Sequence, residues 1–149
     1  DDIETIHAAT DLLAEAKLSP ELRNEALYYR AKAYTKQKAD KKALEDYREL
    51  AKDTRNSYGA EAKYQVAQSL YDAKEYAAAE KELLNYIEQS TPHAYWLARS
   101  FVLLSDVYHA TGKDLDARQY LLSLQQNYQG NDDIQSMIES RLRKLKVEN

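Results

Sequence analysis

One pattern of small and large apolar residues occurs three times along this chain of 149 residues. Its most constant member is a small residue, found at Ala31, Ala67 and Ser105, so successive copies lie 36 and then 38 residues apart. Apolar or aromatic residues follow at the same four distances in every copy: Tyr34, Ala43, Tyr47 and Leu50; Leu70, Ala79, Leu83 and Tyr86; and Tyr108, Ala117, Leu121 and Leu124. A segment repeated at this period cannot bury its apolar face alone, so we expect the copies to stack side by side.

The spacing inside each copy predicts two helices joined by a tight turn. The segment 60–88 is the plainest example, because its apolar residues recur every three or four positions on either side of a short polar break. Only three glycines and two prolines are present, which favours helices over a fold rich in turns and strands. We therefore predict an all-α fold of about eight helices.

Turn and capping residues divide the chain into repeats. The boundaries predict a lone second helix at 1–17, three helix pairs at 20–55, 57–90 and 92–129, and a final capping helix at 132–147. We expect Ser19, before Pro20, and Thr91, before Pro92, each to start a helix, and Gly112 to end one. Other helix starts are expected at Asp40, Ser57, Asp114 and Asp132.

The repeated columns resemble the tetratricopeptide repeat (TPR) family. The copy most similar to the family pattern consists of Leu27, Ala31, Tyr34, Ala43, Tyr47 and Leu50. Arg30 and Lys63 stand in columns that are usually apolar, and the copies are longer than the usual period of about 34 residues. In these respects the chain is similar to the divergent arrays of bacterial cell-envelope proteins. The resemblance implies a right-handed α-solenoid of antiparallel helix pairs over essentially the whole chain.

The resemblance also implies a binding groove lined by the first helix of each pair. It assigns to this groove Glu25, Tyr28, Tyr29, Lys32 and Thr35; Glu61, Tyr64, Gln65, Gln68 and Tyr71; and Arg99, Val102, Leu103, Asp106 and His109. From these positions we expect a peptide or a helix to be held by Tyr28, Lys32, Tyr64, Gln68, Tyr71, Arg99 and Asp106. The three tyrosines of that set are expected to be exposed. The alternative is that they fill the core, because tyrosine is abundant in this chain.

A carboxylate clamp is not expected in this groove. One subclass of the family binds C-terminal carboxylates through five basic and amide side chains. The matching positions here are Tyr28, Lys32, Gln65, Arg99 and Leu103, and only Arg99 keeps the charge type of the clamp. We therefore predict that acidic C-terminal tails are not the ligands.

The chain contains one tryptophan, Trp96, next to Tyr95 at the start of a predicted helix. We interpret this pair as a wedge between adjacent repeats. A binding hot spot is the alternative, because tryptophan is enriched at such positions.

Acidic and histidine residues at helical spacing raise the alternative of a metal site. Glu4, His7 and Asp11 have the spacing of ligands in di-iron bundles, and Asp106 lies one turn from His109. Such sites need further ligands on facing helices, so we interpret both groups as solvated helix faces. The sequence also lacks a glycine-rich phosphate loop and a nucleophile motif. We therefore expect no catalytic residue, no cofactor and no metal.

Charge and composition narrow the class of partner. A net charge of -4 gives no bulk attraction to nucleic acid or to an anionic membrane, and acidic residues surround the basic cluster at 36–42. No apolar run approaches the length of a membrane span, and the absence of cysteine excludes disulfides and thiolate metal sites. We expect a protein or peptide partner, no nucleic acid and no direct membrane insertion.

Two functions remain as hypotheses. The first is a non-catalytic protein-protein interaction scaffold that uses the concave face. The second is a structural spacer in a longer repeat protein of the bacterial cell envelope, with end-to-end self-association. The chain begins at Asp1 on the second helix of a repeat, which we interpret as a fragment of a larger protein. The resemblance favours the cell envelope or periplasm, with the cytoplasm as the alternative compartment.

Overall fold

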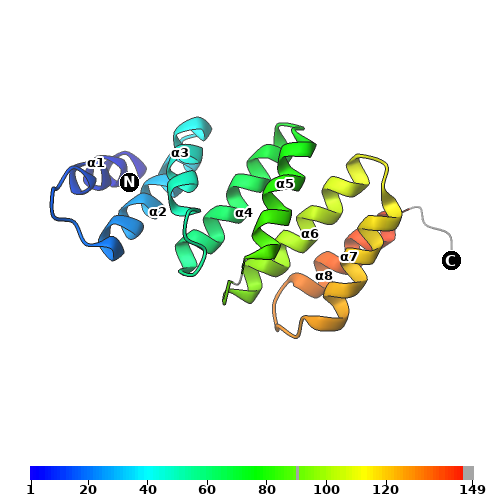
Figure 1. The fold of residues 1–149 in the computed structure, drawn as a ribbon. Helices are drawn as coiled ribbons and strands as arrows, with labels where there is room; N and C mark the ends of the chain where they lie inside the picture. The colour runs from blue at the N-terminus through cyan, green and yellow to red at the C-terminus, as the bar shows by residue number, and fades with distance from the viewer. Residues whose placement is uncertain (90, 146–149) are drawn as a thin grey trace. The chain divides into compact units, whose positions relative to one another are not determined.

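A computed structural model describes residues 1–89 and 91–145 of the chain. In this part the chain forms eight α-helices and no strand, which confirms the predicted all-α class (Figure 1). The helices are α1 (Asp2–Leu13), α2 (Pro20–Lys36), α3 (Asp40–Leu50), α4 (Ser57–Asp72), α5 (Tyr76–Glu88), α6 (Ala94–Ala110), α7 (Asp114–Asn127) and α8 (Ile134–Lys144). Ser90, the predicted end of the second repeat, and residues 146–147 of the predicted capping helix lie outside the described residues.

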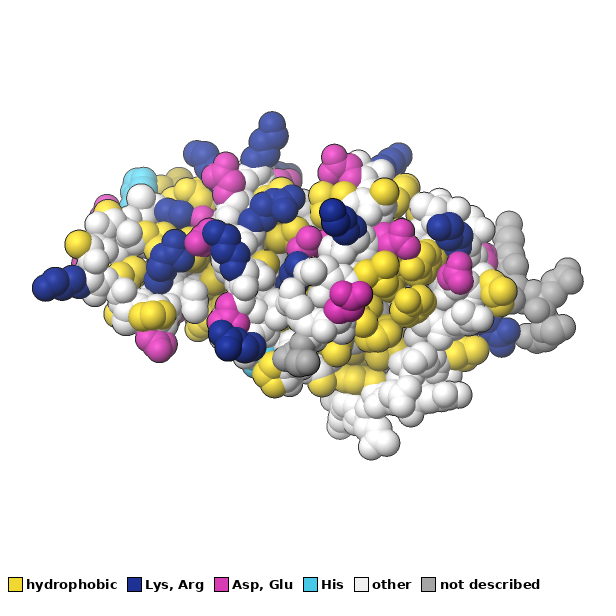
Figure 2. Space-filling model, viewed as in Figure 1, with side chains coloured by type: hydrophobic (Ala, Val, Ile, Leu, Met, Phe, Trp, Pro, Cys, Tyr) yellow, Lys and Arg dark blue, Asp and Glu magenta, His cyan; other side chains and the backbone are white. Residues whose placement is uncertain are grey.

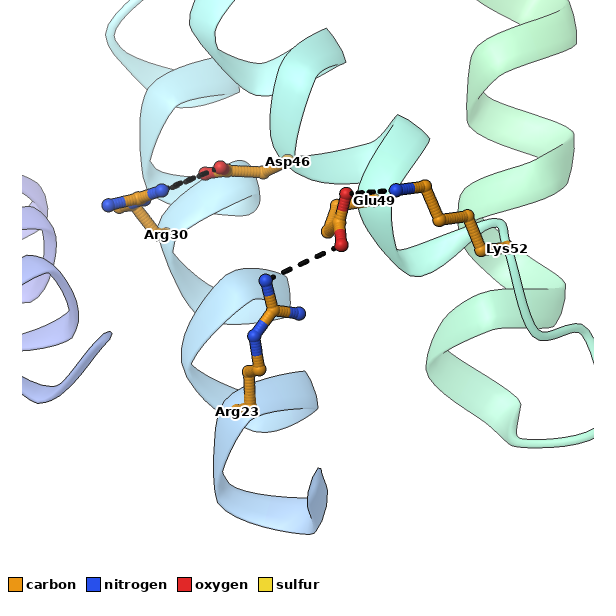
Figure 3. Close-up of polar contacts among 5 residues, drawn as sticks. All are labelled: Arg23, Arg30, Asp46, Glu49 and Lys52. Atoms are coloured by element: carbon orange, nitrogen blue, oxygen red, sulfur yellow. Dashed lines mark hydrogen bonds and ion pairs between the residues drawn. The ribbon is translucent and has the colours of Figure 1, made fainter. Parts of the chain in front are cut away.

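The helices form two compact units, Asp1–Val66 and Ala67–Asn149, whose boundary falls inside α4. In the first unit α2 packs against both α1 and α3. Ion pairs show that α2 and α3 are antiparallel, because Arg23 near the start of α2 pairs with Glu49 near the end of α3. Further along α2, Arg30 pairs with Asp46, which lies earlier in α3 (Figure 3).

In the second unit α6 packs against α5, α7 and α8. Two side-chain contacts show that α8 runs in the same direction as α6. Tyr95 at the start of α6 donates a hydrogen bond to Asp133, just before α8, over 2.9 Å. Asp106, later in α6, accepts from Arg141, later in α8, over 3.3 and 3.4 Å. The core between these helices contains Ala98, Val102, Leu121, Leu124, Ile134 and Ile138.

The repeated small residues are buried where helices approach one another. Ala31, Ala67 and Ser105 are each no more than 1% exposed. A small side chain lets two helix backbones come close, so its burial in every copy explains why this column is the most constant one. The apolar pattern in the sequence therefore marked the packing face of each helix pair.

The tight turn inside each helix pair has the same backbone geometry in all three copies. Lys38, Lys74 and Gly112 adopt positive φ angles of 58°, 61° and 79°. They are 36 and then 38 residues apart, which matches the sequence pattern. In each turn the next backbone N–H donates to the carbonyl oxygen five residues earlier, over 2.8–2.9 Å. This closes the helix end in the manner of a Schellman motif. The predicted end at Gly112 is confirmed.

Two predicted helix starts that used proline have different outcomes. The Ser19 hydroxyl accepts from the backbone N–H of Leu22 over 3.2 Å and caps α2, as predicted. The predicted start at Thr91 is wrong, because the Thr91 hydroxyl accepts from the N–H of His93 over 3.2 Å and α6 begins only at Ala94. His93 precedes α6, so this hydrogen bond closes a turn before the helix and does not cap its first turn.

The predicted helix starts at aspartate and serine residues are only partly correct. Asp40, Ser57 and Asp114 are the first residues of their helices and not the capping residues before them. At α4 the cap is the preceding Asn56, whose side-chain oxygen accepts from the N–H of Gly59 over 2.8 Å. Asp132 does bond to the start of α8, where it accepts from the N–H of Ile134 over 3.0 Å.

The first helix is shorter than predicted, because α1 ends at Leu13 and not at residue 17. Ala16, which the sequence pattern placed on the buried face, is exposed. A helix end without buried apolar contact has little to hold it, since most helical stability in proteins comes from packing.

Candidate binding surface

A stripe of exposed side chains runs along α2. It consists of Leu22, Glu25, Tyr29 and Lys32, whose spacing of three and four residues places them on one side of the helix. Leu22 is 47% exposed and Tyr29 is 49% exposed, and they are two of four large hydrophobic residues exposed in the described part of the chain. We call this set the α2 stripe. Exposed large apolar residues that gather on one face are typical of an interaction site.

A hydrogen-bonded network holds the base of the α2 stripe. The Tyr28 hydroxyl donates to Glu61 Oε1 over 2.8 Å, and Lys32 Nζ lies 3.6 Å from Glu61 Oε2. The same ammonium group lies 5.1 Å from the centroid of the Tyr28 ring, within cation–π distance. The Lys32 charge is therefore balanced by a buried carboxylate. The network also joins α2 to the first half of α4, which belongs to the same unit.

Two side chains of this network, Tyr28 and Lys32, have raised pKa values. Burial raises the pKa of Tyr28, so its hydroxyl remains protonated and can donate to Glu61. The hydrogen bond with Tyr28 raises the pKa of Lys32, so its ammonium group remains charged. Both shifts move the pKa values of Tyr28 and Lys32 further above neutral pH.

Three tyrosine rings support the middle of the α2 stripe. The Tyr28 ring packs edge-on against Tyr29, with centroids 5.4 Å apart, and lies tilted against Tyr58 of α4 at 4.7 Å. Such ring pairs contribute about 0.5–1.5 kcal/mol beyond the area they bury. The exposed Tyr29 ring is thus supported by the ring of Tyr28, which packs in turn on Tyr58.

The predicted groove residues of the first unit are only partly correct. Tyr28 is half-buried beside the α2 stripe, and Lys32 is part of it, with 46% of its side chain exposed. The expectation that Tyr64 is exposed is wrong, because this residue is only 5% exposed. Helical periodicity assigns residues to one face, whereas α4 is buried on several faces between Ala60 and Ala67. The stripe on which Tyr64 lies is therefore covered.

In the second unit, the predicted residues Gln68 and Tyr71 engage neighbours in sequence. Gln68 Nε2 donates to Asp72 Oδ1 over 2.8 Å. The Tyr71 ring is half-buried and packs edge-on against Tyr76, with centroids 5.6 Å apart. Both side chains are partly accessible to solvent, and both are already held by contacts within the chain.

The predicted Arg99 is held by aromatic rings of its own helix. Its guanidinium carbon lies 5.9 Å from the Tyr95 ring centroid and 5.8 Å from that of Trp96. Its Nη1 also donates to the Tyr95 hydroxyl over 2.9 Å. Tyr95 and Trp96 pack edge-on with centroids 5.1 Å apart, and both are half-buried. The aromatic pair at the start of α6 therefore holds a cation of this chain.

The predicted Asp106 forms an ion pair with Arg141. Burial raises the pKa of Asp106, and the neighbouring Arg141 opposes that shift. His109, one turn further on, does not pair with Asp106: its Nδ1 lies 2.8 Å from Asp114 Oδ1. The charge of Asp106 is therefore largely neutralised within the chain.

Two residues of the candidate surface were missed by the sequence interpretation. Leu22 lies seven residues before Tyr29 and so occupies the same side of α2, a spacing that the sequence does contain. Tyr58 packs on Tyr28 across two helices, and only the tertiary structure reveals that contact.

Among residues 1–89 and 91–145, no cluster of three or more acidic, histidine or cysteine side chains is arranged to bind a metal ion. The helices in the same ranges are too short or too polar to cross a membrane. No protein-family model, curated protein sequence or solved structure matches the chain.

Proposed function

We propose that this chain is a non-catalytic protein-binding scaffold of TPR type. In this proposal its helix pairs form a right-handed solenoid, and a peptide or a helix binds to the face formed by the first helices. The shared turn geometry of the three pairs supports a repeat fold. The parallel direction of α6 and α8 supports it too, since the first helices of successive pairs run in the same direction in such a stack.

The observation that carries the proposal is the α2 stripe. Leu22 and Tyr29 expose large apolar side chains on one helix face, with Glu25 and Lys32 on the same face to provide polar contacts. Aromatic anchors surrounded by polar groups are the usual composition of a protein interface. The network beneath the stripe keeps these side chains in place, which lowers the entropy lost on binding.

The chemistry of the α2 stripe favours a mainly apolar partner segment. Lys32 is already paired with Glu61, so it is not an unbalanced cation for a C-terminal carboxylate. We therefore propose a helix or an extended peptide that covers Leu22 and Tyr29 with apolar side chains. In the second unit we propose weaker contacts with a partner at Gln68, Tyr71, Arg99 and Asp106, because each is already held by contacts within the chain.

A structural spacer in a longer protein of the bacterial cell envelope is the second candidate. Its support is that Arg99 contacts the rings of Tyr95 and Trp96 and that Asp106 pairs with Arg141, which leaves less charge available for a ligand. The residues of α8 that are exposed, Gln135, Ser136, Glu139, Arg143 and Lys144, are all polar. A polar outer face favours a cap at this end of the stack over end-to-end self-association there.

The two candidates are separated by a pull-down from a lysate of the source organism with quantitative mass spectrometry. The variant Leu22→Ala/Tyr29→Ala removes both apolar side chains of the α2 stripe. Leu115→Ala is the control, since Leu115 of α7 is a large hydrophobic residue that is even more exposed, at 60%. We expect the double variant to lose at least tenfold in enrichment of the specific partner, and the control to retain it. Equal recovery by both variants would favour the spacer.

A further inference from the structure

The second unit contains an apolar hollow on its surface. It lies between the start of α6 and the end of α7 and has a volume of about 250 Å³. Its walls include Leu97 and Phe101 of α6 and Leu124 and Tyr128 of α7. Hydrophobic side chains gather over these two helices on the face shown in Figure 2. We call this feature the α6–α7 hollow.

The first helix pair fills the equivalent place with charged side chains. The turn residues Lys38 and Gly112 set the alignment of the two pairs at 74 residues, so Leu97 corresponds to Arg23 and Ser123 to Glu49. In the first pair, Arg23 lies 3.4 Å from Glu49, which also lies 2.7 Å from Lys52 (Figure 3).

In the third pair the equivalent residues cannot form such a bridge. Leu97 carries no charge, and the Ser123 side chain is too short to reach across to α6. The third helix pair therefore lacks the charged bridge that the first pair places between the start of its first helix and the end of its second.

The far wall and the rim of the α6–α7 hollow are held in position. The Tyr128 hydroxyl donates a short hydrogen bond to the Asp132 carboxylate, which fixes the ring that forms one wall. At the rim, Asn127 Nδ2 donates to the backbone oxygen of Ser123 over 2.7 Å. This bond uses the amide nitrogen of Asn127, a residue that lines the hollow, and its amide oxygen can accept a hydrogen bond.

We propose that the α6–α7 hollow binds the side chain of a tyrosine or tryptophan on a protein partner. An aromatic ring matches the apolar walls, and its O–H or N–H group can donate to the Asn127 oxygen at the rim. None of the residues that line the hollow is charged, so the partner segment is uncharged at the point of contact.

The open form of the hollow favours a side chain over a free small molecule. Sites for small molecules bury most of the ligand surface, whereas this hollow is partly open to solvent. A side chain that projects from a protein is covered by the rest of that protein, which also excludes water from the rim. This site is separate from the α2 stripe, and its occupancy does not depend on binding there.

The test uses methyl-labelled full chain in NMR titrations with N-acetyl-tyrosinamide and N-acetyl-tryptophanamide. We expect weak, saturable binding, with shifts centred on the methyl groups of Leu97 and Leu124. The variant Leu97→Arg/Ser123→Glu places the charged pair of the first repeat across the hollow and is expected to raise the Kd at least tenfold. Leu115→Ala is the control and should leave it unchanged. Absent shifts, or equal affinity in the charged variant, would overturn the proposal.

A second variant keeps the test decisive if the charged pair prevents folding. Ser123 is exposed, so Ser123→Trp should fold and place its own indole in the hollow, which should abolish probe binding. Two further measurements test the other possible occupants, a second copy of this chain and a small molecule: sedimentation velocity of the unmodified chain, and titration with p-cresol or indole. If the unmodified chain is a dimer and the Ser123→Trp variant is a monomer, the hollow is occupied by a second copy of this chain. If p-cresol or indole binds more tightly than the two amides, the hollow is a site for a small molecule. Either result contradicts the proposed binding of a separate partner protein.

Discussion

The guanidinium group of Arg30 in α2 donates two hydrogen bonds to the carboxylate of Asp46 in α3, over 2.8 and 2.7 Å (Figure 3). A third bond joins Arg30 Nη1 to the Thr10 hydroxyl of α1 over 3.1 Å. One side chain thus connects three helices of the first unit. Arg30 is accommodated between these helices because the carboxylate of Asp46, whose side chain is only 6% exposed, pairs with its guanidinium group in a bidentate manner.

Removal of Arg30 should destabilise the first unit strongly. Arg30→Ala leaves the buried Asp46 carboxylate without its partner, and we expect a loss of about 3–5 kcal/mol in the free energy of unfolding. The double variant Arg30→Met/Asp46→Leu removes both charges and should lose much less. Urea unfolding followed by circular dichroism measures both. A double variant as unstable as Arg30→Ala would show that the pair does not act as a unit.

Glycine in place of Lys38 should stabilise the first helix pair. Lys38 has a φ of 58°, a conformation that costs a residue with a side chain about 1 kcal/mol and that glycine adopts freely. We expect Lys38→Gly to raise the free energy of unfolding by about 0.5–1 kcal/mol. Gly112→Ala, at the equivalent turn of the third pair, should lower it by a similar amount. Thermal unfolding measures both, and a loss of stability in Lys38→Gly would contradict the role of the turn.

Gly59 should tolerate no larger residue. A methyl group on Gly59 would lie 1.7 Å from the backbone oxygen of Asp53 and 2.8 Å from that of Leu50, so the loop before α4 would have to move. We expect Gly59→Ala to cost about 3 kcal/mol of unfolding free energy. Ser57→Ala in the same turn is the control, and it should change stability by less than about 0.5 kcal/mol because Ser57 is exposed.

The buried Asp106 should make stability depend on pH in a particular direction. Burial raises the pKa of Asp106 in the folded chain above its ordinary value of 3.8, so the folded state binds the proton more tightly than the unfolded state does. This contribution to stability is complete below pH 3.8 and is lost as the pH rises through the raised pKa. In the variant Asp106→Asn, the free energy of unfolding should therefore change less with pH between 3.8 and the raised pKa of Asp106.

Carboxyl NMR measures the same pKa directly. Arg141→Met removes the cation that opposes the effect of burial, so it should raise the pKa of Asp106 further. A lower pKa in Arg141→Met would contradict the assigned cause.

Much of the local structure could be predicted from the sequence. The columns that contain Ala31, Ala67 and Ser105 predicted the buried face of the helix pairs, because a helix repeats its faces every three to four residues. Gly112 predicted a helix end because glycine readily adopts positive φ. Lys38 and Lys74 also adopt positive φ although neither is a glycine, since the helices on either side fix the conformation of the turn.

Burial and pairing of the candidate residues could not be predicted in this way. Tyr64 and Tyr29 are both tyrosines at predicted groove positions, yet Tyr64 is buried and Tyr29 is half exposed. Their difference depends on how many neighbours surround each helix, which periodicity does not encode. The α6–α7 hollow likewise is lined by residues of two helices, among them Leu97 and Ser123, that lie far apart in the sequence.

The sequence by itself determined that this chain forms paired helices with a repeated apolar face, because side-chain spacing along a helix is a local property. The tertiary structure decided which polar side chains pair, which tyrosines remain at the surface and where an apolar space is left open. Those outcomes depend on distances between residues far apart in the chain, and only packing fixes such distances.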